Sequence, residues 1–434
     1  MKRVFSTIAV ASFAIASFAG GLLTNTNQSA SFVRNPARYA SLDADAVYFN
    51  PAGTAFLKEG WTVSANWQMI RQDRDVYSYA PISEHKGSVF VPIMPTFFGT
   101  YKTGDWAFSA FFGMPGGGGN AKFDNGLAMF NTMGDELLKG FAVPLKASSV
   151  FESTQYLFSL QLGAAYQITD NLSAYGGIRA NYTSLSYEGS ISAKAIGLDI
   201  LALELTQTGL AFAPIVGIDY KVGDFNFGVK YEFRAVNTIK NDTKNLSSAA
   251  LGWKMPQIGS NLDGKLGLLA AQMPKLAALA SLQDGEKFRN DAPALLSIGA
   301  SWDITDRVKV MGAGTYYFDK DAKIESLLGK SNTMKALSRN TFELLAGVEF
   351  KATEKLLLSS GIQFSDYGVN ESYISQISFI NDAFMIGAGG KYSINEKWDL
   401  NFGACYANYA HFTDESARYR RTTLNVAVGV DFRF

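Results

Sequence analysis

Apolar and polar residues alternate along most of this chain, most clearly in segment 422–434. Within it, every second position carries a large apolar residue: Leu424, Val426, Val428, Val430, Phe432 and Phe434. The positions between them carry Asn, Ala, Gly, Asp and Arg. A period of two is typical of a β-strand with one apolar face. Similar runs begin at Trp61, Trp106 and Phe225, so the chain is predicted to be rich in strands.

Two kinds of connection alternate strictly between the predicted strands. Six are short and polar and carry turn-forming residues: 103–105, 169–171, 223–224, 305–307, 352–355 and 395–397. Seven are longer: 73–92, 114–153, 189–207, 237–292, 320–339, 369–381 and 411–418. Thirteen connections join fourteen strands, so the pattern predicts a fourteen-stranded sheet.

This alternation indicates a closed barrel in an outer membrane. A sheet in lipid must close on itself, because no water is present to satisfy the backbone groups of an open edge. Bacterial outer-membrane barrels have even strand counts, short periplasmic turns and longer outer loops. A soluble β-sandwich or a solenoid is the alternative, but a sandwich does not require such regular connections. We therefore predict an all-β fold, a fourteen-stranded antiparallel transmembrane β-barrel over residues 61–434.

The charge of the chain narrows the choice of partner. Lys plus Arg and Asp plus Glu number 39 each, so the net charge is zero, which argues against nucleic-acid binding. Charged residues make up 18% of the chain, below the roughly 25% of soluble domains. The single cysteine, Cys405, excludes an internal disulfide.

The first residues have the pattern of a secretory signal peptide. Lys2 and Arg3 precede an apolar stretch at 4–18, and small residues follow. A single membrane anchor is the alternative, but the apolar stretch is short for one. We predict a signal peptide at residues 1–19, with an approximate cleavage site, and a location in the outer membrane of a Gram-negative bacterium.

Residues 20–60 precede the first strand and are predicted to form a plug. They contain Asn-Pro-Ala twice, at 35–37 and 50–52. Proline lacks an N–H group and resists incorporation into a sheet. The neighbouring apolar residues at 47–49 and 56–57 require burial, and the barrel lumen is the place that offers it.

The segment SFVRNPARYASLDADAVYFNPAGTAFL at 31–57, followed by fourteen strands, resembles the FadL family of outer-membrane transporters for long-chain fatty acids and other hydrophobic compounds. The resemblance spans nearly the whole mature chain. The Asn-Pro-Ala motif of the family's N-terminal hatch matches Asn50, Pro51 and Ala52, with Gly53 next. The resemblance implies that 20–60 is a hatch that seals the lumen and can rearrange; a static plug turn is the alternative.

The resemblance also implies that the third and fourth outer loops are helical and present an apolar landing site. The third loop contains Ile196, Ile200, Leu201 and Leu203. The fourth contains Leu266, Leu268, Leu269, Met273, Leu276 and Leu279 at about helical spacing. An exposed apolar patch of this kind suggests capture of a hydrophobic ligand. Packing of the two loops on each other is the alternative.

Strand three ends in a stretch that does not suit a sheet: Met114, Pro115, Gly116, Gly117, Gly118 and Gly119. The family's third strand is kinked and leaves an opening in the barrel wall. The resemblance therefore implies a lateral opening here, through which a hydrophobic solute enters the membrane. An ordinary flexible loop is the alternative.

Three cations are predicted to point into the lumen from the alternation of their strands: Arg179, Lys230 and Arg234. A cation in a partly dry pocket can bind a fatty-acid carboxylate. Pairing with inward acidic residues is the alternative, since barrel interiors are polar in any case. No local motif marks the residues that bind the carboxylate elsewhere in the family.

Catalytic motifs are missing from the sequence. The two histidines, His85 and His411, accompany no G-x-S-x-G motif, and there is no P-loop or Cys/His cluster. We predict a monomeric protein, not an enzyme, without cofactor or metal. It takes up a hydrophobic small molecule passively, with long-chain fatty acids as first candidate, and contacts outer-membrane lipid. A general porin or a structural or adhesive outer-membrane protein is the alternative.

Overall fold

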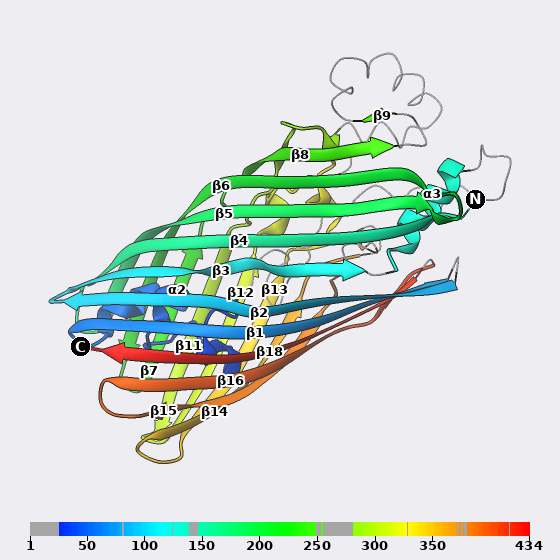
Figure 1. Cartoon of the computed structure of the whole chain (residues 1–434). Coiled ribbons are helices and arrows are strands. Elements are labelled where there is room, and N and C mark those ends of the chain that lie inside the picture. The colour runs from blue at the N-terminus through cyan, green and yellow to red at the C-terminus, as the bar shows by residue number, and fades with distance from the viewer. Residues whose placement is uncertain are drawn as a thin grey trace.

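A single antiparallel sheet closes on itself to form a barrel (Figure 1). The computed structural model describes residues 26–79, 82–123, 125–138, 146–248, 253–254, 281–327, 329–370, 373–374, 376, 380–415 and 417–434. The strand β1 (Gly60–Tyr79) pairs with β2 (Ile82–Thr103) on one side and with the last strand, β18 (Ala417–Arg433), on the other. This pairing leaves no open edge and confirms the predicted closed barrel of fourteen strands.

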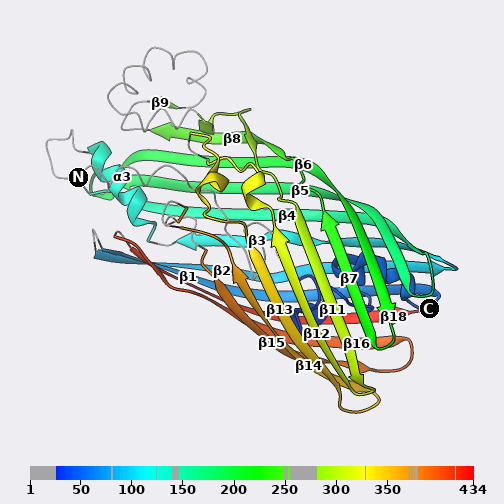
Figure 2. The ribbon, with the colours of Figure 1, turned by 180° about the vertical axis from the view of Figure 1, so that it is seen from behind.

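The wall consists of fourteen strands, each antiparallel to its neighbours. Between β2 and β18 these are β3 (Trp106–Phe123), β4 (Ser148–Gln167), β5 (Leu172–Ala193), β6 (Leu198–Val222), β7 (Phe225–Glu232), β11 (Leu295–Thr305), β12 (Val308–Tyr317), β13 (Phe342–Lys351), β14 (Leu356–Asp366), β15 (Ala383–Ser393) and β16 (Trp398–Tyr409). The strands β11 to β15 form the side nearer to the viewer in Figure 2. The other strands belong to the outer connections: β8 (Thr238–Ser248), β9 (Trp253–Lys254), β10 (Lys287–Arg289) and β17 (Phe412–Thr413).

Side chains alternate between lipid and lumen along the wall. In β16 the residues from Asp399 to Tyr409 are alternately buried and exposed, and the exposed ones are mainly apolar. Large aromatic side chains are exposed where the short turns lie, among them Trp61, Trp106 and Trp398. A lipid-facing apolar band bordered by aromatic residues is the usual exterior of an outer-membrane barrel.

Two predicted long connections are largely strand. The segment 73–92 belongs almost entirely to β1 and β2, and 189–207 to β5 and β6, joined by the 3₁₀ turn η2 (Lys194–Ile196). The structure has a strand where the resemblance implied a helical third loop. Beyond the membrane both faces of a hairpin can be hydrated, so charges such as Asp73 do not end a strand there.

Short helices complete the fold. The helices α1 (Ala30–Arg34), α2 (Ala46–Phe49) and η1 (Pro51–Phe56) lie inside the barrel, whereas α3 (Ala128–Leu138), η5 (Asp319–Asp321) and η6 (Thr333–Ala336) belong to the outer connections. No helix in the described part of the chain is long and apolar enough to cross a membrane. The predicted signal peptide, 1–19, lies outside the described residues.

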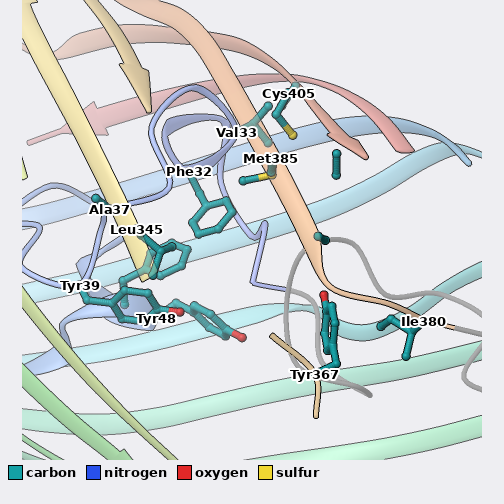
Figure 3. Packing of buried hydrophobic residues seen from close by; sticks show 14 of the residues in the cluster. Phe32, Val33, Ala37, Tyr39, Tyr48, Leu345, Tyr367, Ile380, Met385 and Cys405 are labelled. Atoms are coloured by element: carbon teal, nitrogen blue, oxygen red, sulfur yellow. The ribbon is translucent and has the colours of Figure 1, made fainter. Parts of the chain in front are cut away.

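The core lies within the lumen and has two main parts. At the end with the short turns, hatch residues such as Phe32, Tyr39 and Tyr48 pack against Leu345 and Met385 of the wall (Figure 3). Toward the outer loops, apolar side chains from the wall strands β1 to β6 and β18, and from β8, β10 and other residues of the outer connections, form a second group, named here the apolar lumen cluster. Its members include Ile70, Val76, Val91, Met94, Met114, Phe123, Phe151, Leu185, Leu205, Ile239, Phe288 and Tyr419.

Candidate functional site

The predicted hatch motif forms a tight turn that is fastened to the wall. Pro51 begins η1, where its missing N–H is not needed. The Asn50 amide donates to the Ser41 carbonyl oxygen (3.1 Å) and to the carboxylate of Asp219 on β6. The wall approaches closely at Gly228 of β7, where an added Cβ would lie 2.7 Å from Asn50 Oδ1. The interruption of the apolar run therefore shapes a turn that fits one place on β6 and β7.

The first Asn-Pro-Ala piece is seated on β13 and β14 in a similar way. The Asn35 side chain accepts from Ala37 N–H at 3.2 Å, which closes a local turn. An added Cβ at Gly347 would overlap this side chain, and one at Gly361 would lie 2.7 Å from Pro36 Cδ. Each Asn-Pro-Ala piece thus depends on wall glycines, because only glycine leaves room for so close an approach.

Two arginines that flank the first piece anchor the hatch to β13. Arg34 Nη1 lies 3.0 Å from Glu349 Oε1, and Arg38 Nη1 lies 3.3 Å from the same oxygen. Arg38 also bonds Asp45 at 2.9 Å and Asp43 at 2.7 Å. Burial alone would lower the pKa of Arg38, but Asp45, Asp43 and Glu349 hold it well above its ordinary value. Buried charges of this kind are stable only when paired, so Glu349 is a main attachment of the hatch.

The wall is interrupted between β2 and β3. Pairing runs from the short turn to Phe97 opposite Phe112, stops, and resumes only at Val89 opposite Ala121. We name the unpaired stretches, 90–96 on β2 and 113–120 on β3, the wall break. The alternation of burial also ends there, since Gly113 to Gly117 are all buried, so β3 turns toward the lumen.

Proline accounts for the missing pairs. Trp61 exchanges backbone hydrogen bonds of 2.8 and 3.0 Å with Phe434 of the C-terminus. The backbone N–H and C=O groups of odd-numbered residues of β1 therefore point away from β2. Trp67 is one of them, and its partner Pro95 therefore directs its backbone toward β3. Pro95 has no N–H to donate there. On β3, Pro115 also lacks an N–H and lies in the bulge where pairing with β4 is interrupted.

Glycine allows the bend in β3. The register against β4 shifts twice, between Gly113 and Gly116 and between Gly117 and Gly119, so the strand carries two bulges. Gly117 has φ of +68°, a conformation that favours glycine. The predicted stretch Met114 to Gly119 is thus a bulged part of the strand and not a loop.

The hatch reaches into the wall break. Gln28 Nε2 donates to the Met114 carbonyl oxygen at 3.2 Å. An added Cβ on Gly113 would lie 2.7 Å from Gln28 Oε1, so the amide packs directly on the bulge. By the alternation in β3, the Met114 carbonyl faces β2, and Gln28 supplies the hydrogen bond that β2 does not make.

Replacing Gln28 by Ala is expected to loosen this contact. Loss of one neutral hydrogen bond costs about 1 kcal/mol, which corresponds to about a fivefold higher population of the detached state. Hydrogen exchange of the segment 26–30 measures this directly, with Gln167→Ala at the end of β4 as the matched control. Unchanged exchange in the Gln28 variant would show that the contact does not hold the segment.

Comparison with known proteins identifies the fold. The family model for outer membrane protein transport proteins (OMPP1/FadL/TodX) matches residues 9–433. The chain belongs to this family. A FadL homologue from Pseudomonas aeruginosa is 17% identical, with a TM-score of 0.70, over 96% of this chain and 100% of that one. No curated protein sequence matches the chain.

Two toluene transporters have similar structures. TbuX of Ralstonia pickettii is 14% identical with a TM-score of 0.59, over 90% of this chain and 94% of that one. TodX of Pseudomonas putida is 14% identical with a TM-score of 0.62, over 96% of this chain and 100% of that one. At such identities the likeness concerns the fold alone, while the family model identifies a transport protein of the outer membrane.

Within this FadL-type barrel, the hatch covers two of the three predicted lumen cations. Arg179 pairs with Glu232 at 2.7 Å, and its guanidinium lies 4.7 Å from the centre of the Tyr48 ring. Lys230 Nζ donates to the Tyr48 carbonyl oxygen at 2.9 Å and lies 4.8 Å from the same ring. Both cations are almost fully buried. A ligand carboxylate therefore reaches them only after Tyr48 has moved.

The third cation is not where the sequence placed it. Arg234 is exposed and donates to the Asp321 carbonyl oxygen in an outer connection. The alternation of β7 ends at Glu232, and both Phe233 and Arg234 are exposed. The inward placement of Arg234 was wrong because the period of two was extended past the end of the strand.

The predicted capture loops are only partly described. Ile196 is exposed at the tip of the β5–β6 hairpin, whereas Ile200 is buried against Ile191 and Leu138 of α3. Leu201 and Leu203 are partly buried beside the apolar lumen cluster. The fourth-loop residues lie outside the described residues: Leu266, Leu268, Leu269, Met273, Leu276 and Leu279.

Sequence reasoning missed Gln28 and Glu349. No local signal marks Gln28, since its role depends on a bulge nearly ninety positions away in the chain. Arg34 and Arg38 did carry a signal, because two arginines in a segment expected to be buried require an acidic partner. The family resemblance pointed to the right stretch of β3, but not to Pro95 on the facing strand.

Proposed function

We propose that this protein takes up a hydrophobic compound passively, with long-chain fatty acids as the first candidate, and releases it sideways into the outer membrane. The observation that carries this proposal is the position of the wall break. Met94 and Met114 lie within it and belong to the apolar lumen cluster, so apolar surface continues from the lumen to the interrupted wall. An apolar solute lowers its free energy by leaving water for such a surface.

The steps follow from the contacts of the hatch. A ligand enters from the outer loops and packs on the apolar lumen cluster. At the other end hatch residues pack tightly against the wall, which disfavours passage straight through the barrel. Displacement of Gln28 from Met114 frees the lumen side of the wall break, and the ligand leaves there. A net movement down a concentration gradient requires no cofactor and no coupled energy source.

The substrate class depends on the lumen cations. If Tyr48 moves with the hatch, Arg179 and Lys230 gain access to a ligand carboxylate, and a fatty acid binds more tightly than its uncharged analogue. The toluene transporters of similar fold are named for a hydrocarbon without such a group. Comparing a charged with an uncharged ligand therefore distinguishes the two kinds of substrate.

Binding of a fluorescent long-chain fatty acid and of the matching alcohol to the detergent-purified protein tests the proposal. We expect saturable binding that Leu203→Ser weakens about tenfold, because a Leu side chain contributes roughly 1.5–3 kcal/mol when buried. Leu210→Ser is the control, since Leu210 lies on the same strand but faces lipid.

Absence of saturable binding for both ligands would contradict the proposal. A large ohmic conductance in a planar bilayer would then favour the general porin. Binding that is equal for acid and alcohol would retain uptake of a hydrophobic compound and remove the role of Arg179 and Lys230.

A further inference from the structure

The lipid-facing wall carries a groove beside the wall break. Its volume is about 500 Å³, and apolar atoms make almost all of its lining. The floor consists of small residues, Ala65, Gly99 and Ala110, on three adjacent strands. Large apolar side chains form its sides: Val63, Phe97, Phe112, Leu160, Trp398, Val430 and Phe432. These strands lie on the side of the barrel nearer to the viewer in Figure 1. We name this feature the outer groove.

The outer groove begins where the wall break ends. Phe97 and Phe112 are the last paired residues before the break, and both line the groove. On the lumen side, Met94 and Met114 lie within the same break and are members of the apolar lumen cluster. Apolar residues thus follow one another along β2 and β3 from the lumen cluster through the break to the groove.

The size and chemistry of the groove define what it can hold. Its volume of about 500 Å³ falls within the roughly 300–1,000 Å³ of small-molecule sites. The lining offers almost no polar surface, so it cannot select a lipid head group or a carboxylate. The occupant that fits is the hydrocarbon part of a small molecule, which gains contact with the aromatic sides.

We propose that the outer groove is an exit subsite, in which the transported compound binds by its hydrocarbon part after it has passed the wall break. The inference rests on the proposed function. Bulk lipid chains compete for the groove, but a solute leaving the break meets it first. Contact with its sides stabilises the solute outside the barrel and so opposes its return to the lumen.

Filling the groove tests this inference. An added Cβ at Gly99 meets no atom within 4 Å, so a side chain at this position starts in open space, and Gly99→Leu fills the floor of the groove. Gly312 on β12 is also lipid-facing and equally open, and Gly312→Leu is the matched control. Uptake of a fluorescent long-chain fatty acid into proteoliposomes and its binding to the detergent-purified protein are measured for both variants.

We expect Gly99→Leu to slow uptake about fourfold or more. This is the change expected when roughly one methylene group of the bound compound loses its contacts with the groove. Binding in the lumen stays unchanged, and Gly312→Leu matches the unaltered protein in both assays. Equal uptake by the two variants, with the unaltered protein active, would overturn the exit subsite and leave the proposed function intact. Failure of the unaltered protein to bind or transport the acid would overturn both.

Tryptophan fluorescence gives a second readout that needs no change in the groove floor. A brominated fatty acid is expected to quench Trp398, which lines the groove, at lower concentration than Trp302, which faces lipid on β11. Trp398→Phe then removes the saturable part of the quenching, and Trp302→Phe retains it. Equal quenching of the two tryptophans would count against a binding site in the groove.

Discussion

Replacing Glu349 by Gln is expected to detach the hatch from β13. The substitution keeps the shape of the side chain but removes the carboxylate shared by Arg34 and Arg38. Both guanidinium groups are about 1% exposed, so water cannot replace the lost charge. Removing one partner of a buried ion pair costs roughly 3–5 kcal/mol. Arg38 keeps Asp45 and Asp43, and Arg34 therefore loses more.

Hydrogen exchange in the hatch measures this effect. A loss of roughly 3 kcal/mol raises the exchange of backbone amides in 30–56 by about a hundredfold when exchange follows detachment of the hatch. Glu354→Gln, in the exposed turn after β13, is the control and is expected to leave exchange unchanged. If Glu349→Gln behaves like this control, then the hatch is held by packing and not by its ion pairs.

The barrel itself could be predicted from the sequence because it depends on a local pattern. The lipid face requires apolar side chains at every second position, and the closed sheet requires an even set of antiparallel strands. Both requirements produce patterns among residues close together in the sequence, such as the alternation in 422–434. The ends of the strands were harder to predict, because charged residues such as Asp73 and Asp75 are compatible with a strand once it leaves the membrane.

The candidate site could be predicted only in part, because its contacts join segments that lie far apart in the sequence. The hatch motif at Asn50 was evident from its prolines, yet its partner Asp219 belongs to β6. Likewise, the break in the wall involves Pro95 and Pro115 on two strands, and Gln28 of the hatch contacts it. A family resemblance identifies the stretch that bends, while the residue that occupies the bend is seen only in the structure.

Closing the wall break is expected to abolish uptake while binding in the lumen persists. The break contains seven residues on β2 and eight on β3, between pairs 97–112 and 89–121. One bulge on β2 and two on β3 account for the irregular register. Deleting Pro92, Pro115 and Gly118 leaves six residues on each strand, so the ladder can run in register. Pro95→Thr in the same protein restores the missing donor toward β3.

The repaired barrel gains the backbone hydrogen bonds that the native wall lacks, and a bilayer favours every such bond. We therefore expect a barrel at least as resistant to heat as the native one, judged by its mobility in unheated detergent gels. Fatty-acid uptake into proteoliposomes falls to the level of vesicles without protein. Pro95→Thr alone is the control, because the bulges keep β2 and β3 out of register and uptake continues. Transport by the repaired barrel at the native rate would place the exit elsewhere, and the straight path past the hatch would then be the route to examine.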